Sequence, residues 1–494
     1  MLDYILYPMS KIKKVVLSIA ISLQIILCQA QSLYNAHQYA IHITIKPYHE
    51  KCIYLGYYYG NQKGIIDSVC LNSRGEGIFT GADLLPGGVY FVIGPQKTIL
   101  FDFLIDKQQR FSIDADTTGL RQNIHFSQSE DNRLFNEYTL FINTIAEKIK
   151  QTERTLSTTT DKQKKVAQKK LDALHKQMDQ YRENSIKQYP YSFLTVLLNA
   201  LKDPLLPSSV RDMRKNKMEA FQYLKKHYWS NIDFTDGRLV RTPILENKLD
   251  QYFEKFVAPA TDSIIHEIDG MLNVAQSDST MYRFLIGKFI DQYMNTNIMG
   301  QDAVFVYLFQ QHIAAGQVKW LTEEQRKYIY NRAYSVMANL IGRPSINVRL
   351  ADTADHITSL YDIKAPYTLV CFWDPTCSHC AHLIPKLDSM YHKNWENIGL
   401  KIFAIMVDSD KATWLKAIHE HGIEDWVNVY YTELLRIKES IAKQPTYRQL
   451  YDAFTIPTLV LLDADKNIIA KNLDYLQLNE FLQYRIREQK KVKD

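Results

Sequence analysis

The chain has 494 residues, of which 46% are hydrophobic and 23% charged, and its formal net charge is +5. This length predicts about three domains, and the composition is ordinary for a soluble protein with large cores. No dense basic stripe is interleaved with aromatic residues, which argues against nucleic acid as a partner. Six cysteines are too few for a fold that disulfides hold together.

The first 30 residues have the layout of a secretion signal. Lysines within 11–14 precede an apolar run at 15–27, and small residues end the segment at Ala30. This order predicts a signal peptide over 1–30 that is cleaved after Ala30. The run is short for a membrane span, but lipid attachment at Cys28 and an uncleaved anchor stay open. We therefore expect an exported protein of the periplasm or cell envelope, where disulfides form and persist.

Residues 31–128 are predicted to form a β-sandwich-like domain. Strand-like runs occur at 40–45, 52–58, 77–81, 89–93, 99–103 and 109–113. Short strands at intervals of about eight to twelve residues favour a sandwich or a partly open barrel. No group of polar residues in this region suggests catalysis.

Two cysteines of this region, Cys52 and Cys70, flank the glycine-containing turn at 60–64. A hairpin folded about that turn brings them near each other, so one interpretation is a disulfide across the two strands. The other is two separate buried cysteines. The sequence favours the second interpretation, because a free cysteine packs as a small hydrophobic residue.

Residues 129–338 have a helical pattern. Apolar residues recur with helical spacing over 134–149 and again over 171–181, on either side of a polar break, which predicts a helical hairpin. Further helices are predicted at 191–202, 209–227, 245–257, 261–276, 280–295, 301–315 and 322–340. Single histidines on these helices show no repeated spacing with other ligand residues, so they are interpreted as packed or surface residues and no metal site is predicted.

Residues 339–494 are predicted to form an α/β domain, and the Gly-Arg-Pro at 342–344 marks its start. Strands are expected at 367–373, 400–407, 427–431, 458–462 and 467–471, and helices at 378–392, 414–426 and 476–489. A βαβ unit followed by a ββα unit is the thioredoxin arrangement. The helix and strand between 414 and 431 are predicted to be inserted between these two units.

The motif Cys377-Ser378-His379-Cys380 joins a predicted strand to a predicted helix. Two cysteines at such a turn can close a small disulfide, and backbone N–H groups at the helix N-terminus favour the thiolate of the first one. The thiolate is the reactive species in thiol–disulfide exchange. Half of a zinc site has the same motif, but no second pair of ligands follows. The Cys377–Cys380 disulfide is therefore expected to be the redox centre, with no other cofactor.

The residues around this motif resemble the thioredoxin superfamily. Residues 372–380 are similar to its active-site turn, Pro385 stands where the family has a helix-kinking proline, and 454–462 is similar to its cis-proline loop. A cis-proline exposes the preceding backbone for pairing with an extended substrate.

A mechanism is hypothesised on these residues. Cys377 forms a mixed disulfide with the substrate, Cys380 resolves it and His379 tunes the thiolate. Pro457 and the Ile456 backbone dock the substrate strand. Trp373, Asp374 and Pro375 shape the rim of the docking site, although Trp373 could equally be a core residue.

Nearly all of the mature chain resembles a group of Bacteroidota envelope proteins. These join an N-terminal β-domain and a helical region, both of unknown function, to a C-terminal thioredoxin domain of the TlpA/ResA type. The resemblance rests on the segments at 241–249, 299–305, 341–344, 360–366 and 372–377. It implies a multidomain thiol–disulfide oxidoreductase that faces the periplasm. Protein thiols and disulfides would be its substrates, and a membrane protein its electron donor.

Two residues depart from the thioredoxin pattern. Cys371 stands where thioredoxin has a buried aspartate, so the usual proton acceptor for the second thiol is missing. His379 lies between the two cysteines, as in the DsbA oxidases, where it favours the thiolate and makes the disulfide more oxidising. Because relatives of the TlpA/ResA type are generally reductants, both redox directions stay open.

Two other classes of function stay open. A long region precedes the thioredoxin-like part, which allows a binding or scaffold protein whose thioredoxin fold acts only on bound partners. Cycling of both cysteines with a small dithiol would distinguish these classes. A peroxidase is a weaker alternative, because Pro375-Thr376-Cys377 is too compressed for the peroxiredoxin pattern.

Overall fold

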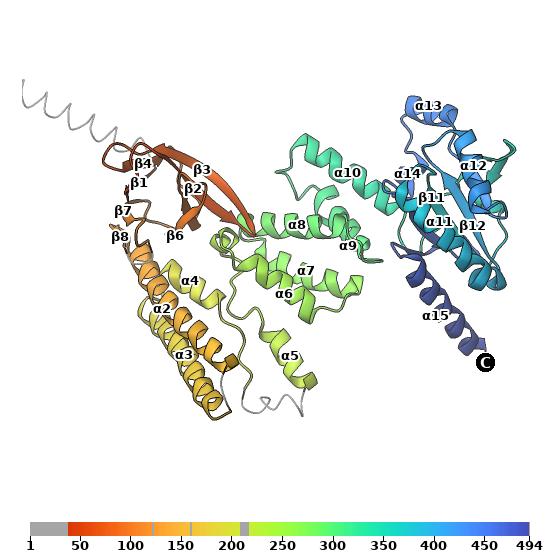
Figure 1. Cartoon of the computed structure of the whole chain (residues 1–494). Coiled ribbons are helices and arrows are strands. Elements are labelled where there is room, and N and C mark those ends of the chain that lie inside the picture. Colours follow the sequence, from red (N-terminus) through yellow and green to blue (C-terminus); the bar gives the residue numbers. More distant parts are fainter. Residues whose placement is uncertain (1–37, 121–122, 159–160, 208–216, 494) are drawn as a thin grey trace, which may run out of the picture. The chain divides into compact units, whose positions relative to one another are not determined.

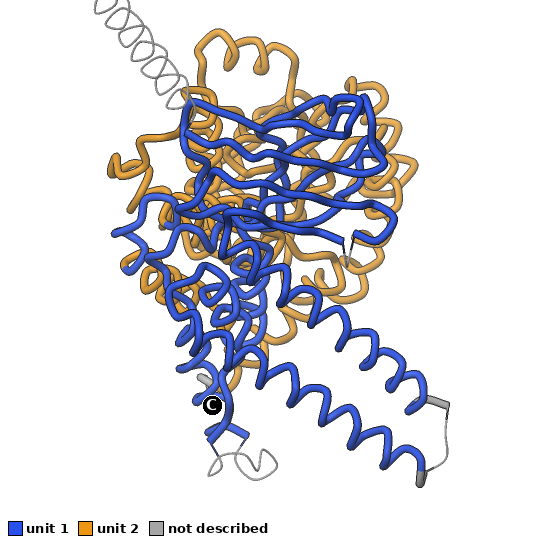
Figure 2. Tube along the Cα trace, turned by 90° about the vertical axis from the view of Figure 1, so that its left-hand side faces the viewer, with its two compact units in different colours: residues 1–256, 274–281 blue, residues 257–273, 282–494 orange. Residues whose placement is uncertain are grey.

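The computed structural model describes residues 38–120, 123–158, 161–207 and 217–493, and the predicted signal peptide at 1–30 lies outside them. The chain contains a β-rich region, a helical region and a C-terminal domain built on a sheet (Figure 1). It divides into two compact units, Met1–Phe256 with Val274–Met281 and Val257–Asn273 with Tyr282–Asp494 (Figure 2). Within the described ranges, each helix is too short or too polar to cross a lipid bilayer.

The β-rich region consists of two four-stranded sheets, ordered β4-β1-β7-β8 and β3-β2-β5-β6. The strands are β1 Tyr39–Lys46, β2 Cys52–Tyr59, β3 Gln62–Cys70, β4 Glu76–Gly81, β5 Gly88–Ile93, β6 Ile99–Ile105, β7 Arg110–Asp116 and β8 Ile124–Ser127. The predicted β-sandwich-like fold is confirmed.

Alternating side chains build the core of this sandwich. Along β1, Ile41, Ile43 and Ile45 are at most 1% exposed, and they join the core cluster that Tyr90 of β5 and Phe103 of β6 also enter. The period of two places every second residue of a strand on the inner face. The inner faces of both sheets therefore supply one shared apolar core.

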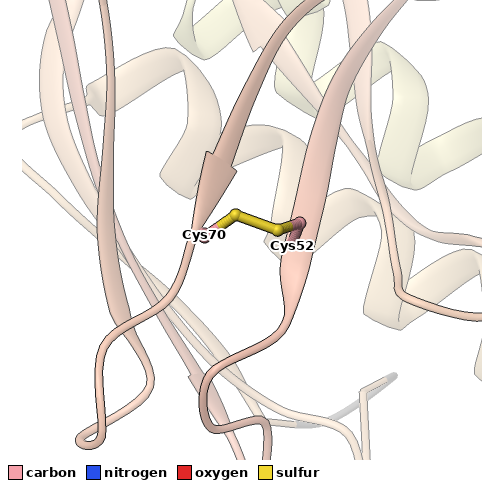
Figure 3. The surroundings of a disulfide bond; sticks show 2 residues. All are labelled: Cys52 and Cys70. Carbon is pink, nitrogen blue, oxygen red and sulfur yellow. A yellow bond between two sulfur atoms is a disulfide. The ribbon is translucent and has the colours of Figure 1, made fainter.

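A disulfide joins Cys52 at the start of β2 to Cys70 at the end of β3 (Figure 3). The favoured prediction of two separate buried cysteines is therefore wrong, since both residues are exposed as well as bonded. The register of the antiparallel ladder places Cys52 directly opposite Cys70. Opposed residues of such a ladder bring their Cβ atoms to the separation that a disulfide needs.

The helical region comprises α2 Glu130–Thr158, α3 Asp161–Gln188, α4 Phe193–Ala200, α5 Lys217–His227, α6 Leu245–Phe256, α7 Thr261–Ala275, α8 Ser279–Met294, α9 Asp302–Leu308 and α10 Glu323–Met337. A short 3-10 helix, Gly237–Arg241, precedes α6, and a π-helix, Phe309–Ala314, follows α9. The predicted hairpin is formed by α2 and α3, where the rings of Phe141 and Tyr181 stack at 4.0 Å. The predicted helix at 209–227 is described only from Lys217 onward.

The C-terminal domain has a seven-stranded sheet, ordered β10-β9-β13-β12-β11-β14-β15. Its strands are β9 Arg349–Asp352, β10 Ile357–Ser359, β11 Tyr367–Trp373, β12 Leu400–Met406, β13 Val427–Tyr430, β14 Thr458–Leu462 and β15 Ile468–Lys471. Its helices are α11 Ser378–Met390, α12 Lys411–His421, α13 Glu433–Ala442, α14 Tyr447–Leu450 and α15 Tyr475–Lys493, with short helical turns at Leu360–Asp362, Tyr391–Trp395 and Glu396–Ile398.

The central strand β11 is buried along its whole length. It runs parallel to β12 and antiparallel to β14. Cys371 and Trp373 enter the core cluster that includes Ile384 of α11, whereas Phe372 enters a second cluster with Tyr451. Burial on both faces is typical of a sheet that is covered on each side. The predicted thioredoxin-like α/β fold is confirmed, and it places the turn after β11 at the carboxyl end of this central strand.

Candidate functional site

The two cysteines of the motif lie at the start of α11. Cys377 is the N-cap residue of the helix and is half-buried, whereas Cys380 lies one helical turn further along and is fully buried. Both are free thiols. A substrate disulfide can therefore reach Cys377 but not Cys380.

Burial raises the pKa of the Cys380 thiol to about 12. The charges of Cys377 and Asp374 add to this rise, while a hydrogen bond involving the Asp374 backbone opposes it. A thiol of this pKa is almost entirely protonated near neutral pH and is a poor nucleophile until it loses its proton. Cys380 thus has the character of a second, protected thiol.

A cis-proline loop lies beside Cys377. The Ile456–Pro457 peptide bond is cis, and the Cys377 thiol donates to the Ile456 carbonyl oxygen at 3.7 Å. Ile456 and Pro457 are both half-buried. The structure thus brings together residues 79 positions apart that the sequence assigned to substrate exchange and docking.

A buried carboxylate holds the turn before the motif. Asp374, 1% exposed, accepts hydrogen bonds from the backbone and hydroxyl of Thr376 at 2.9 and 2.5 Å and from the backbone and hydroxyl of Ser409 at 2.7 Å each. The Asp408 backbone N–H donates to it at 3.1 Å. Burial raises the pKa of this carboxyl, but these hydrogen bonds outweigh burial and leave the pKa below its usual value. Asp374 therefore fixes the turn as an anion and is a weak proton acceptor.

Arg448 of α14 connects this turn to the cis-proline loop. Its guanidinium donates to both carboxylate oxygens of Asp408 at 3.1 Å. It also donates to the carbonyl oxygens of Ala453 and Phe454, each at 3.1 Å. Since Asp408 bonds Asp374 through its backbone, one continuous polar network fixes both sides of Cys377.

The sequence does not indicate this network. It predicts only a place at the rim for Asp374 and no role for Ser409 or Arg448. An aspartate two residues before a threonine after a buried strand is a turn signal that could have indicated the first contact. The contacts of Arg448 join segments far apart in the chain, and no local pattern marks them.

The remaining predicted site residues have different surroundings. Trp373 is 1% exposed and packs in the core, so its predicted contact with substrate at the rim is wrong. Pro375 is half-buried and His379 is exposed at the first turn of α11. The tuning role of His379 and the docking role of Pro375 stay predictions.

Cys371 is fully buried on β11 behind the motif. Burial, with a smaller contribution from Cys380, holds the pKa of its thiol far above the ordinary value. A protonated thiol of this kind cannot act as the base that a carboxylate at this position would supply. Neither Cys371 nor Asp374 is thus a strong proton acceptor for the buried Cys380.

One group of metal-binding residue types occurs among the described residues. The side chains of Asp388, His392 and Asp425 have ligand atoms within 4.8 Å of one another. They lie toward the far end of α11 from Cys377, and His392 also faces Glu396 at 3.5 Å. His392 lies 3.4 Å from Asp388 and 3.8 Å from Asp425.

The family models that match the chain agree with this division. Residues 163–336 match a domain of unknown function, DUF5106, and residues 366–468 match the family described as thioredoxin-like. No curated protein matches the chain.

Several solved structures are similar to parts of the chain. A domain of a possible thiol-disulfide isomerase from Cytophaga hutchinsonii is 32% identical, with 31% of this chain and 97% of that chain covered and a TM-score of 0.27. The thioredoxin domain of a thiol-disulfide oxidoreductase from Bacteroides vulgatus is 26% identical, with 29% and 96% covered and a TM-score of 0.26. A thioredoxin-like protein from Bacteroides caccae is 22% identical, with 57% and 98% covered and a TM-score of 0.45.

The geometry of the cysteine turn, the cis-proline loop and the family matches lead to one assignment. The chain carries a C-terminal thioredoxin-like domain, which a domain of unknown function precedes.

Proposed function

We propose that the protein is a thiol–disulfide oxidoreductase that acts on protein substrates through Cys377 and Cys380. The observation that carries this proposal is the half-buried Cys377 thiol at a helix N-terminus, 3.7 Å from the carbonyl oxygen that precedes the cis-proline. The names of the similar Cytophaga and Bacteroides proteins support the same class.

The reaction follows from the exposure of the two thiols. The Cys377 thiolate attacks a substrate disulfide, forms a bond to one substrate sulfur and releases the other as a thiolate. Cys380 then loses its proton and attacks the Cys377 sulfur. This step closes the Cys377–Cys380 disulfide and releases the second substrate sulfur. The same steps in reverse oxidise a substrate dithiol.

The setting of this reaction is part of the proposal. The sequence of residues 1–30 predicts export, so the working compartment is the periplasm or the cell envelope. A dithiol protein of the membrane would restore the reduced state if the protein acts as a reductase. The second candidate, a scaffold whose thioredoxin fold acts only on bound partners, differs in requiring a partner for turnover.

Turnover with a single protein disulfide tests the proposal. Wild-type protein is mixed with a disulfide-bonded polypeptide and a small dithiol as electron source, and the loss of substrate disulfide is followed. We expect wild-type turnover and none with Cys377→Ala. The matched control is Cys371→Ala, which removes the third thiol of the same domain and should retain turnover. Turnover by Cys377→Ala, or none by wild type, would contradict the proposal.

A further inference from the structure

A cavity of about 940 Å³ lies in the second unit beside the redox site. One side is lined by α10 and the segment after α8, which include Tyr328, Asn331 and Tyr334. The opposite side is lined by the segment after α13 and by Phe454, Thr455 and Thr458. The cavity is therefore bounded both by the helical region and by the thioredoxin-like domain.

Residues on both sides of the cis-proline bond line the cavity. Thr455 and Thr458 line it and flank the Ile456–Pro457 bond in the sequence. The carbonyl oxygen of Ile456 faces Cys377. A chain that lies along the cis-proline backbone with its disulfide at Cys377 thus has the cavity next to it.

The lining is aromatic and rich in amides. Tyr334 is 61% exposed, Tyr328 56% and Phe454 55%, which is high for side chains of this size. Asparagine and glutamine residues, among them Asn331, also line the cavity. Amides both donate and accept hydrogen bonds, as an extended peptide backbone does, and aromatic faces suit its apolar side chains.

Charges in the lining largely cancel. Arg332 of α10 forms an ion pair with Asp452, and Lys471 of β15 forms a buried ion pair with Asp302 at 2.5 Å. Lys443 adds a further positive charge to the lining. Asp302 is not itself a lining residue, but with its charge counted against Lys471 the net charge at the cavity is about one. Because most of the positive charge is paired, the cavity does not favour a phosphate or another strongly anionic ligand.

The same contacts attach the helical wall to the thioredoxin-like domain. Arg332 of α10 is paired with Asp452 of the thioredoxin-like domain, and its donation to the Met294 carbonyl oxygen of α8 at 3.0 Å holds the guanidinium in place within the helical region. Asn339 donates to the Tyr451 carbonyl oxygen at 2.8 Å and accepts a hydrogen bond from Lys471. Asn339 and Tyr451 are both buried. The walls are thus joined by buried polar contacts, which keep the cavity formed without a ligand.

We infer that this cavity binds an extended polypeptide segment adjacent to the reacting disulfide of the substrate. Residues of α10, which belong to the DUF5106 match at 163–336, form one wall. The inference rests on the proposed function and gives that domain a role in selecting polypeptide substrates. Small disulfides do not need the cavity, because they require only Cys377.

The test compares the rates of two substrates in a variant that alters the cavity and in a control variant that does not. The reduced protein is mixed either with a small aromatic disulfide or with an unfolded disulfide-bonded polypeptide, and the second-order rate constant of Cys377 is measured. In the double variant Tyr328→Ala/Tyr334→Ala we expect about a tenfold fall with the polypeptide and no change with the small disulfide, because exposed aromatic anchors commonly carry binding energy. The control is Tyr484→Ala of α15, a tyrosine of similar exposure, 58%, that does not line the cavity.

The outcomes separate the inference from the proposed function. An unchanged polypeptide rate in the double variant would overturn the inference and leave the oxidoreductase proposal intact. Competition by a neutral oligosaccharide but not by a cysteine-free peptide would also overturn it. Failure of the wild type to react with either disulfide would refute the proposed function and the inference together. A normal rate with the small disulfide shows that the variant domain is folded.

Discussion

The chain contains two cysteine pairs in opposite settings. Cys52 and Cys70 face each other across an antiparallel ladder and are bonded, whereas Cys377 and Cys380 are free thiols on the first turn of a helix. The first pair joins residues that face each other on two paired strands. The second lies at the N-terminus of α11, beside the cis Ile456–Pro457 bond. We infer from this difference that local surroundings, rather than the presence of two cysteines, separate a structural crosslink from the proposed redox centre.

Among changes to the two pairs, removal of the protected thiol Cys380 should have the largest effect on turnover. In Cys380→Ala the mixed disulfide at Cys377 cannot be resolved from within the protein. We expect turnover to fall at least about a hundredfold while substrate accumulates on Cys377. Non-reducing electrophoresis and mass spectrometry of the adduct would measure this. Equal trapping by Cys377→Ala would show that the roles of the two thiols are wrongly assigned.

Removing the structural pair should affect stability instead. The disulfide joins residues separated by 18 positions, so the chain-entropy relation gives a stabilisation of roughly 3 kcal/mol. For Cys52→Ser/Cys70→Ser we expect a loss of up to this amount in urea unfolding, with disulfide turnover retained. A loss of turnover at unchanged stability would mean that this pair takes part in the redox reaction.

Disruption of the polar network around Cys377 should have the next largest effect, on the rate of reaction with polypeptide disulfides. Arg448→Met removes the contacts that join Asp408 to the carbonyl oxygens of the cis-proline loop. A loop displaced by about 1 Å can slow a positioned reaction considerably, and we expect about a tenfold lower rate with polypeptide disulfides. The control is Arg349→Met, an exposed arginine of β9 in the same domain. Equal rates for the two variants would remove Arg448 from the site.

Much of this architecture could be predicted from the sequence. Long alternating or helical patterns located most strands of the sandwich and the hairpin of α2 and α3. The strands β8, β9 and β10 have four, four and three residues, which is too short for a period to emerge. The pairing of Cys52 with Cys70 depends on ladder register, which the sequence leaves open at a turn of uncertain length.

The site residues that belong to short sequence motifs could be predicted. Cys377, Cys380 and Pro457 stand in recognisable motifs, and the structure brings them together. For Trp373 the sequence left core and rim equally open. Every residue of β11 is buried, and a strand covered on both faces has no alternation that separates core from rim. Arg448 acts through contacts with segments elsewhere in the chain. Such contacts exist only once the fold has formed.

The pH dependence of the resolving step tests the burial of Cys380. With its pKa raised to about 12, the thiolate fraction rises about tenfold for each pH unit below that value. The rate at which Cys380 releases substrate from Cys377 should therefore climb without a plateau from about pH 7 to pH 10. Stopped-flow measurement on a preformed mixed disulfide would follow it. A plateau near pH 8 would mean that Cys380 titrates as an ordinary thiol.

The smallest expected effect concerns His379, which is exposed beside the two thiols. If its positive form favours the Cys377 thiolate, His379→Pro should lower the reduction potential. We expect a shift of about 30 mV, which corresponds to about 1.4 kcal/mol for a two-electron couple. Ser378→Ala, a change at the neighbouring exposed position, serves as the control. An unmoved potential would leave the reductant interpretation favoured.

A redox titration of the whole chain tests the central claim most directly. Thiols are tagged and identified by mass spectrometry after equilibration in buffers of increasing potential. We predict that Cys377 and Cys380 interconvert as one pair, with a midpoint between about −270 and about −120 mV, while the buried Cys371 stays a thiol. Failure of a Cys377–Cys380 disulfide to form at any potential, or pairing of either cysteine with Cys371, would contradict the account.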